Sequence, residues 1–487
     1  MFYTLRSQGF INSYFLDDSI LFGETKAICK TNILVTGETL EELGFILNIP
    51  KSVTEPTQVM LHLGNIIDTV KMIVYLPEEK KENIKDLCRG LINEHVSTIR
   101  RVAKVIGTMV ASFQATTFGK LHYRELEIQK IEALQRCKGD FDGIMTITPA
   151  MKKDLRYWIE NIDLEIRYIQ IKPADITIQT DSSLVGWACV YGDKIAQGRW
   201  SDAESKLHIN VLELKAILFA ISTYKTEFKY QHVRILTDST TAVNYINNMG
   251  GVKSRQCNDE AKETWEICKE NKIWISCAHI PGHENVADRP SREFKDDIEW
   301  TLDTTIFHRI CAIWDLPSID LFASRLNNQV NNYCSWHPDP FSTHVNAFSI
   351  TWNKYRLVYA FPPFSVIGRV LQKLTEDQSR MILIVPDWAT TPWFSILPSM
   401  MIDHPVRLPR MQRLLRRGQD LHPLRHHLKL IACLLSGNPS HSAGFRQQLK
   451  GLSWRPGVRV RKGNMMCMFA NGPPFVQGNI SIPYLRL

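Results

Sequence analysis

Four acidic residues, each expected at an end of a strand or helix, constrain this chain more than any other feature. Asp181 and Asp238 each end a short β-like run, Glu213 lies in the first turns of an apolar helical stretch, and Asp288 opens a further helix after a loop. Carboxylates that converge from separate elements can hold two divalent cations about 3.5–4 Å apart, an arrangement used to hydrolyse phosphodiesters. Oxygen ligands favour Mg²⁺ or Mn²⁺ over softer metals. The four residues therefore predict a site for two such ions.

The elements expected around these residues form one α/β unit. Strands are predicted at 176–181, 188–191, 194–200, 233–237 and 274–280, and helices at 210–224, 241–248 and 258–271. The first three strands suit a meander rather than a crossover, so we expect a mixed sheet flanked by helices. Any one of the aspartates alone would more often be a helix cap or a turn residue. The interpretation depends on the set of four.

The sequences around the four carboxylates resemble the acidic stations of type 1 ribonuclease H, in that family's order and at its usual spacings. The four motifs are Thr180-Asp181-Ser, Leu212-Glu213-Leu, Leu236-Thr-Asp238-Ser and Ala287-Asp288. The resemblance covers residues 173–295 and implies endonucleolytic cleavage of RNA in RNA–DNA hybrids, with two Mg²⁺ (or Mn²⁺) ions bound by the four carboxylates. In that family a loop histidine before the last aspartate assists product release or proton transfer. His279 matches it best, and His283 is the competing candidate.

The N-terminal part resembles a reverse transcriptase. Within residues 1–74, Tyr14-Phe-Leu-Asp17-Asp18 indicates a strand, a turn and a strand, and resembles the catalytic turn of those polymerases. Residues 75–172 have helical apolar spacing and resemble the thumb and connection of the same enzymes. Only 16 residues precede Asp17, so we expect a further metal-binding aspartate to be missing. The resemblance thus implies a partial palm without polymerase activity, followed by a helical thumb.

From about residue 316 the composition becomes rich in aromatic residues and proline. Residues 316–400 resemble the methyltransferase-like region that follows ribonuclease H in DIRS-type retrotransposons. The resemblance lies in Asp320-Leu-Phe-Ala-Ser324, Tyr359-Ala-Phe-Pro-Pro-Phe364 and Val385-Pro-Asp-Trp388. Phe361 stands where that family's catalytic loop would have an acidic or amide residue, and no glycine-rich loop follows a strand. We therefore expect no methyl transfer here, but a structural role or contact with nucleic acid.

Residues 401–487 are predicted to be a basic segment with an irregular tail. Five arginines fall between Arg407 and Arg417, and Arg413, Arg416 and Arg417 lie at helical spacing. Such a cluster is either a solvated helix face or a phosphate contact. The whole chain has 58 lysines and arginines against 50 acidic residues, a net charge of +8. That excess permits binding to nucleic acid without requiring it.

Composition argues against membrane, secreted and zinc-binding proteins. No continuous apolar run approaches the roughly 18–20 residues of a membrane span, and the first residues lack the pattern of a signal peptide. We therefore expect an intracellular protein without a membrane partner, in the nucleus or the cytoplasm. The 11 cysteines are scattered without paired CxxC motifs, so no zinc site is expected.

These patterns together predict an α/β and α+β multidomain protein derived from a retroelement. The preferred hypothesis is a reverse transcriptase/ribonuclease H protein that retains ribonuclease H activity and binds RNA–DNA hybrid. The alternative is a non-enzymatic nucleic-acid-binding remnant of a retrotransposon polyprotein.

Overall fold

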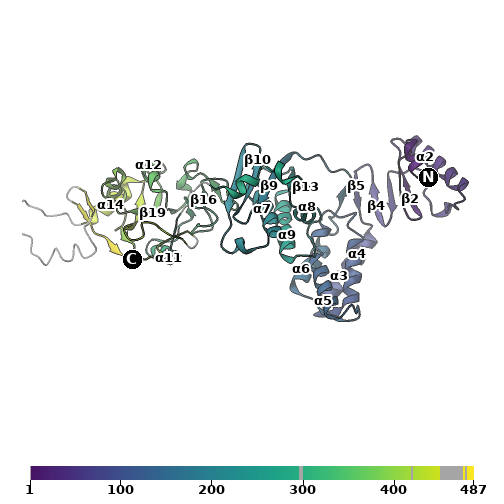
Figure 1. Cartoon of the computed structure of the whole chain (residues 1–487), viewed down its shortest axis with the longest axis horizontal. Coiled ribbons are helices and arrows are strands. Elements are labelled where there is room, and N and C mark those ends of the chain that lie inside the picture. Colours follow the sequence, from purple (N-terminus) through teal and green to yellow (C-terminus); the bar gives the residue numbers. More distant parts are fainter. Residues whose placement is uncertain (1, 295–299, 418–419, 450–474, 478–479) are drawn as a thin grey trace, which may run out of the picture. The chain divides into compact units, whose positions relative to one another are not determined.

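The computed structural model describes residues 2–294, 300–417, 420–449, 475–477 and 480–487. The chain forms two compact units, which are described separately. The first contains residues 1–175 and 244–266, and the second contains residues 176–243 and 267–487. Helices and several small sheets occur in both (Figure 1). Among the described helices, none combines the length and the hydropathy that a membrane crossing requires.

The first unit begins with a short helix, a hairpin and a longer helix. These elements are α1 (Phe2–Ser7), β1 (Asn12–Phe15), β2 (Asp18–Leu21) and α2 (Lys26–Glu42). The predicted strand, turn and strand around Asp17 and Asp18 are thereby confirmed. The tight turn is made possible by Leu16, which has a φ of 54°. The hairpin leaves Tyr14, Phe15 and Leu16 exposed.

A small antiparallel sheet and four helices complete the first unit. The sheet has the order β3 (Val59–His62), β4 (Asn65–Asp68), β5 (Ile73–Tyr75) and β8 (Arg167–Tyr168). The helices are α3 (Glu78–Ile92), α4 (Ile99–Val110), α5 (Arg124–Arg136) and α6 (Pro149–Asn161), with a hairpin of β6 (Val96–Thr98) and β7 (Ile144–Thr146). The predicted helical spacing is confirmed, because the apolar stripe of α4 is buried in this unit's core.

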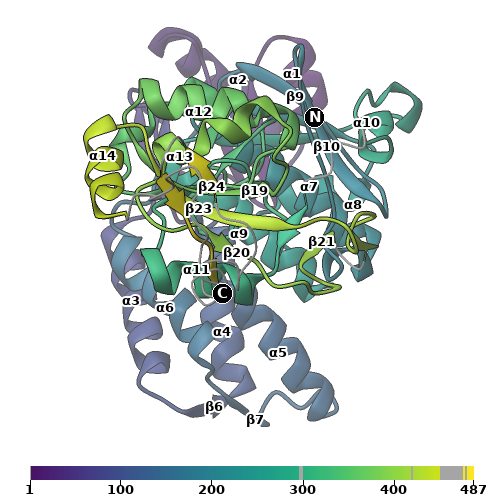
Figure 2. The same cartoon turned by 90° about the vertical axis from the view of Figure 1, so that its left-hand side faces the viewer.

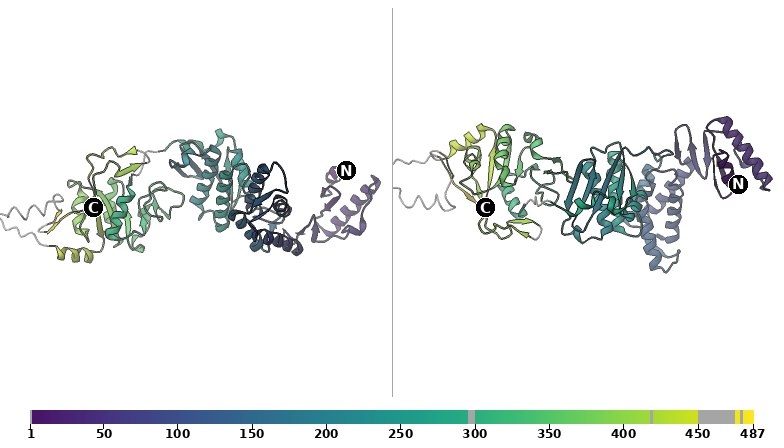
Figure 3. Two further views of the ribbon diagram at one scale, coloured as in Figure 1. Left: turned by 90° about the horizontal axis from the view of Figure 1, so that it is seen from below. Right: turned by 45° about the horizontal axis from the view of Figure 1, so that its top comes forward.

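The second unit contains a five-stranded sheet, which we call the carboxylate sheet. Its order is β11 (Lys194–Arg199), β10 (Gly186–Tyr191), β9 (Ile176–Ser182), β12 (His232–Thr237) and β13 (Trp274–His279). The first three strands form the predicted antiparallel meander, and β12 runs parallel to both β9 and β13. The strands of this sheet are coloured blue to teal in Figure 3. Helix α7 (Ile209–Tyr224) packs against β9 and β10. It is apolar on nearly all sides and nearly all of it is buried.

Three further helices come after α7 in the sequence. They are α8 (Thr240–Asn247), α9 (Arg255–Asn271) and α10 (Asp288–Arg292). The predicted helices at 241–248, 258–271 and after Asp288 are therefore confirmed. Residues 244–266 of α8 and α9 belong to the first unit, whereas α10 lies against β9 and β10.

A six-stranded sheet, the C-terminal sheet, forms the rest of the second unit. Its order is β15 (Ile319–Asp320), β18 (Val358–Ala360), β19 (Arg380–Pro386), β23 (Leu430–Ser436), β20 (Val406–Arg407) and β26 (Leu485–Arg486). Strands β15, β18 and β19 are parallel, and β23 is antiparallel to both of its neighbours. The predicted parallel strand at 381–385 thus has one parallel and one antiparallel partner.

Helices cover both faces of the C-terminal sheet. Met381, Leu383 and Val385 pack in one apolar cluster with α12 (Ile367–Glu376), α13 (Leu397–Met400) and α14 (Pro439–Gln448). Ile382 and Ile384 pack in a second cluster with α11 (Thr304–Trp314). Both faces of β19 are buried, which explains why its sequence is a continuous run of apolar residues.

Two predictions for the C-terminal segment are wrong. Arg416 and Arg417 lie in a strand, β21 (Leu415–Arg417), which pairs with β14 (Thr301–Leu302) and β22 (Asp420–Leu421). The reason is tertiary, because Leu414 and Leu415 are buried in the α11 cluster and β14 pairs with their segment. The predicted irregular tail contains β24 (Phe475–Gln477), β25 (Ile480–Ile482) and β26, while 450–474 lies outside the described residues.

Candidate metal centre

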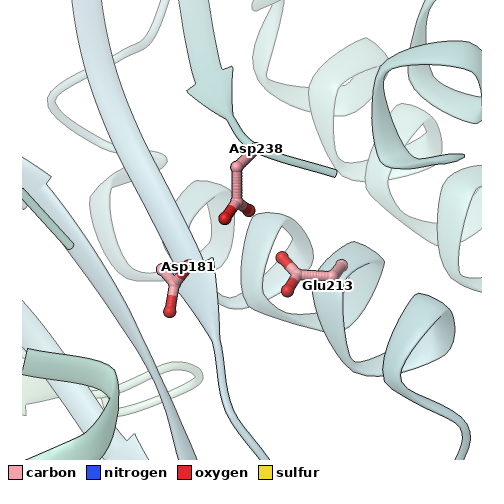
Figure 4. Close-up of side chains that lie close together, drawn as sticks. All are labelled: Asp181, Glu213 and Asp238. Atoms are coloured by element: carbon pink, nitrogen blue, oxygen red, sulfur yellow. The ribbon is translucent and has the colours of Figure 1, made fainter. Parts of the chain in front are cut away.

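Three of the predicted carboxylates converge at one edge of the carboxylate sheet. Each of Asp181, Glu213 and Asp238 offers an oxygen within 4.8 Å of those of the other two (Figure 4). Leu236 of β12 pairs with Gln179 of β9, so two residues further on Asp238 stands opposite Asp181. Helix α7 packs on the same strands and adds Glu213. We call these three residues the carboxylate cluster.

The acidic groups of the carboxylate cluster raise one another's pKa values, because they lie close together and two of them are buried. Asp181 and Glu213 are buried, and Glu213 Oε2 has no hydrogen-bond partner among the described residues. Burial, with the charges of Asp181 and Asp238, raises the pKa of Glu213 to about 9. Burial, with the charges of Asp238 and Asp288, raises the pKa of Asp181 to about 6. Such a group of oxygen ligands is stable with a bound proton or a cation, so the residues fit a hard divalent ion.

Two buried polar side chains support Asp181. Ser291 of α10 donates its hydroxyl hydrogen to Asp181 Oδ2 over 2.6 Å. Asn285 donates from Nδ2 to Asp181 Oδ1 over 3.3 Å and to the carbonyl of Thr180 over 3.0 Å. The sequence interpretation missed both roles. The available signal was two short polar residues, three positions before and three positions after Asp288.

Asp288 lies nearby without joining the close cluster. It is the first residue of α10, and Arg292 one turn later donates to its Oδ1 from Nη2 over 2.7 Å and from Nε over 3.0 Å. Among the described residues, Asp288 is not part of the group whose oxygens all lie within 4.8 Å of one another. Its charge still contributes to the raised pKa of Asp181. The predicted set of four is therefore three converging carboxylates and one neighbour paired with an arginine.

The loop between β13 and α10 approaches the cluster through its backbone. A Cβ added to Gly282 would lie 3.0 Å from Asp238 Oδ2. The two histidines proposed from the sequence flank this glycine: His279 ends β13, and His283 lies in a short 3₁₀ turn (Gly282–Glu284). Both are exposed, and His283 lies 3.6 Å from the carboxylate of Glu284.

The remaining predicted site residues have different surroundings. Asp17 and Asp18 are exposed at the β1–β2 turn, and within the described ranges no metal-sized group of three ligands includes them. Arg413 is exposed. Arg416 lies 3.6 Å from Asp303. Arg417 pairs with Asp420 over 2.9 Å.

Comparisons with known proteins give structural matches only. No protein-family model matches the chain, and no curated protein matches its sequence. One similar structure is the foamy viral protease-reverse transcriptase in complex with RNA/DNA hybrid, 14% identical, with a TM-score of 0.29. That match covers 62% of this chain and 39% of the viral chain.

Two similar structures are ribonucleases. RNase H1 from the halophilic archaeon Halobacterium salinarum NRC-1 is 16% identical, with a TM-score of 0.20, and the match covers 24% of this chain and 92% of that chain. LC11-RNase H1 in complex with RNA/DNA hybrid is 18% identical, with a TM-score of 0.21, covering 24% and 93%. At these scores the matches are partial likenesses of fold and carry no functional weight.

Proposed function

We propose that this chain is a metal-dependent nuclease of the ribonuclease H kind, which cuts the RNA strand of RNA–DNA hybrids. The observation that carries the proposal is the carboxylate cluster, in which three acidic oxygens from β9, α7 and the end of β12 lie within 4.8 Å of one another. The orphaned Glu213 Oε2 adds support, because a buried carboxylate oxygen without a donor is suited to bind a cation.

The residues of the cluster would hold two Mg²⁺ (or Mn²⁺) ions, with Asp288 as a further ligand. Bound ions of this kind supply a more acidic attacking water and neutralise charge on the leaving oxygen. The protein's own part is positioning. Ser291 and Asn285 fix the Asp181 carboxylate by hydrogen bonds, and Arg292 fixes Asp288. Hydrogen bonds of this sort orient metal ligands and are needed for tight binding.

The proposed substrate follows from the resemblance of the four acidic motifs. A nuclease that selects RNA within a hybrid reads the 2′-hydroxyl groups in the shallow minor groove. We propose an RNA–DNA hybrid as the ligand of this chain.

The proposed origin is a retroelement of the DIRS type. It is supported by the order of motifs along the chain: Asp17-Asp18, then the four acidic motifs, then the aromatic and proline-rich region. RNA-directed DNA synthesis is not part of the proposal, since among the described residues no third ligand accompanies the two N-terminal aspartates.

The test is cleavage of an end-labelled RNA–DNA hybrid by the purified full chain, with Mg²⁺ and with EDTA. We expect cutting of the RNA strand only with Mg²⁺, and loss of cutting in Asp238→Asn. Asp193→Asn is the matched control, because Asp193 is exposed in the β10–β11 turn of the same sheet. If a folded chain bound the hybrid and left it intact, the non-enzymatic alternative would replace this proposal.

A further inference from the structure

Basic charge is concentrated at one place in the second unit. Residues 401–429 contain seven lysines and arginines against two aspartates. Their net charge of +5 is more than half of the +8 of the whole chain. Charge of this density on a short segment attracts polyanions over distances of about a Debye length, ~8–10 Å.

These basic residues divide into paired and unpaired groups. Arg407 pairs with Asp387, Arg416 with Asp303 and Arg417 with Asp420. Arg410, Arg413, Arg425 and Lys429 are exposed, and no carboxylate of the described residues pairs with them. The charge of the unpaired side chains is therefore available for a ligand. The sequence predicted a different set, Arg413, Arg416 and Arg417.

A hollow lies beside two of the unpaired side chains, Arg410 and Lys429. It is also lined by the paired Arg407 and by apolar residues that include Leu414 and Leu428, and Arg413 directly precedes Leu414 in the chain. No acidic residue lines the hollow. Its lining residues lie where β20 ends and β23 begins. These two strands are neighbours in the C-terminal sheet, and Figure 2 labels both. An anion would meet two arginines, a lysine and apolar walls there.

An exposed aromatic ring lies beside this hollow. The backbone N–H of Asp387 donates to the carbonyl of Lys429 over 2.8 Å. The next residue in the chain, Trp388, therefore lies close to Lys429. The Trp388 side chain is 37% exposed, and its ring centroid lies 5.1 Å from that of Phe364. Both aromatic residues follow the carboxyl ends of parallel strands, β19 and β18, where open α/β sheets commonly bind ligands.

We infer that this end of the C-terminal sheet, formed by Arg410, Arg413, Lys429 and Trp388, is a binding surface for single-stranded nucleic acid. The cations contact phosphates, and a base stacks on Trp388. A positively charged surface with an exposed aromatic ring matches single strands, whose bases are free to stack, better than duplexes, whose bases are already stacked. The surface shares no residue with the carboxylate cluster, so the inference stands apart from nuclease activity.

The experiment is fluorescence anisotropy of a labelled dT oligonucleotide of 12 nucleotides with the full chain, over a series of salt concentrations. We expect the triple variant Arg410→Gln/Arg413→Gln/Lys429→Gln to bind at least 10-fold more weakly. Loss of three phosphate contacts should make the slope of log K against log salt shallower by about 2. Trp388→Leu should weaken binding about 5-fold or more with the slope unchanged.

The matched control removes the same charge elsewhere. Lys71, Lys138 and Lys253 are exposed outside this surface, and their triple change to Gln should leave the affinity within about 2-fold. Equal losses in the two triple variants would overturn the inference, as would tighter binding of a 12-base-pair duplex than of the single strand. Hybrid cleavage, assayed in parallel, should persist in the Arg410/Arg413/Lys429 variant, which separates this inference from the nuclease proposal.

Discussion

Arg325 of the C-terminal region donates hydrogen bonds from Nη1 to both carboxylate oxygens of Glu204, over 3.0 and 2.9 Å. Its Nη2 also donates to the carbonyl of Arg199, and its guanidinium carbon lies 4.6 Å from the centre of the Phe219 ring on α7. Glu204 stands in the segment between β11 and α7, the helix that carries Glu213. The C-terminal region thus holds in place the segment that precedes α7, the helix that contributes Glu213 to the carboxylate cluster.

Replacing Arg325 by Ala should destabilise the second unit by about 1–3 kcal/mol, because a largely buried charged hydrogen bond is lost. Burial alone would raise the pKa of Glu204, but hydrogen bonds from Ser201 and the charge and hydrogen bonds of Arg325 outweigh it and lower that pKa. A lowered pKa contributes stability that is present above the unfolded value of 4.5 and is lost as the pH falls.

The effect of Arg325→Ala should therefore be larger at pH 7 than at about pH 4, measured by urea unfolding with tryptophan fluorescence. Arg356→Ala removes an exposed ion pair with Asp315 in the same region and is the control, expected to have little effect at either pH. Equal stability of the Arg325 variant and the parent at pH 7 would contradict the prediction.

Ser291→Ala should weaken metal binding at the carboxylate cluster. The variant loses the 2.6 Å hydrogen bond to Asp181 Oδ2, so this carboxylate is less well oriented and holds its proton more tightly. We expect the Mg²⁺ concentration for half-maximal cleavage to rise about 10-fold. Ser205→Ala, which loses only an exposed hydrogen bond to the backbone of Asp202, should leave the half-maximal concentration unchanged.

Glu213→Gln should stabilise the metal-free protein while abolishing metal binding. Because burial and the charges of Asp181 and Asp238 raise the pKa of Glu213 to about 9, folding at pH 7 forces this carboxyl to take up a proton, a cost that glutamine does not have. In EDTA, we expect the melting temperature to rise by about 2–4 °C. Mn²⁺ should raise the melting temperature of the parent chain and leave that of the variant unchanged. Glu227→Gln, at an exposed pair with Lys194, should behave like the parent. A variant still stabilised by Mn²⁺ would contradict the assignment of Glu213.

Gly282→Ala should slow cleavage without unfolding the chain. The new Cβ would lie 3.0 Å from Asp238 Oδ2, so either the loop or the carboxylate must shift. Misplacement of a catalytic group by a fraction of an ångström reduces the rate by about 10-fold or more. Gly368→Ala in α12, where a Cβ meets nothing within 4 Å, is the control and should cut at the parent rate. An unchanged rate in Gly282→Ala would contradict the prediction, because it would mean that the loop moves without displacing the Asp238 carboxylate.

The elements of the carboxylate sheet were predictable because their signals are local. Alternating apolar residues indicate β9. Asp181 lies near the end of β9 and Asp238 directly follows β12, as the sequence predicted. Their convergence also follows, since adjacent parallel strands end at the same edge of a sheet. The supports of Asp181 were not predictable in this way. Ser291 reaches it only because α10 folds back onto β9 and β10, a contact across more than 100 residues.

The C-terminal arginines show the opposite case, in which a local pattern is misleading. Spacing alone suggested a helix for Arg413, Arg416 and Arg417, but β14 lies more than 100 residues earlier in the chain and pairs with Leu415 and Arg416. Non-local pairing overrode the local preference. The pairing of Asp288 with Arg292, in contrast, has the i, i+4 spacing that a sequence can show.

The parallel pairing of β9 with β12 has a consequence for how the chain folds. Asp181 and Asp238 are separated by 57 positions, and α7 lies between their strands in sequence. Such non-local parallel pairing forms slowly, because a long loop must close before any contact is gained. The carboxylate cluster, and with it the proposed cation site, should therefore be absent from an early collapsed chain with local helices and hairpins. Binding of a divalent ion during refolding would mark the moment at which β12 joins the meander.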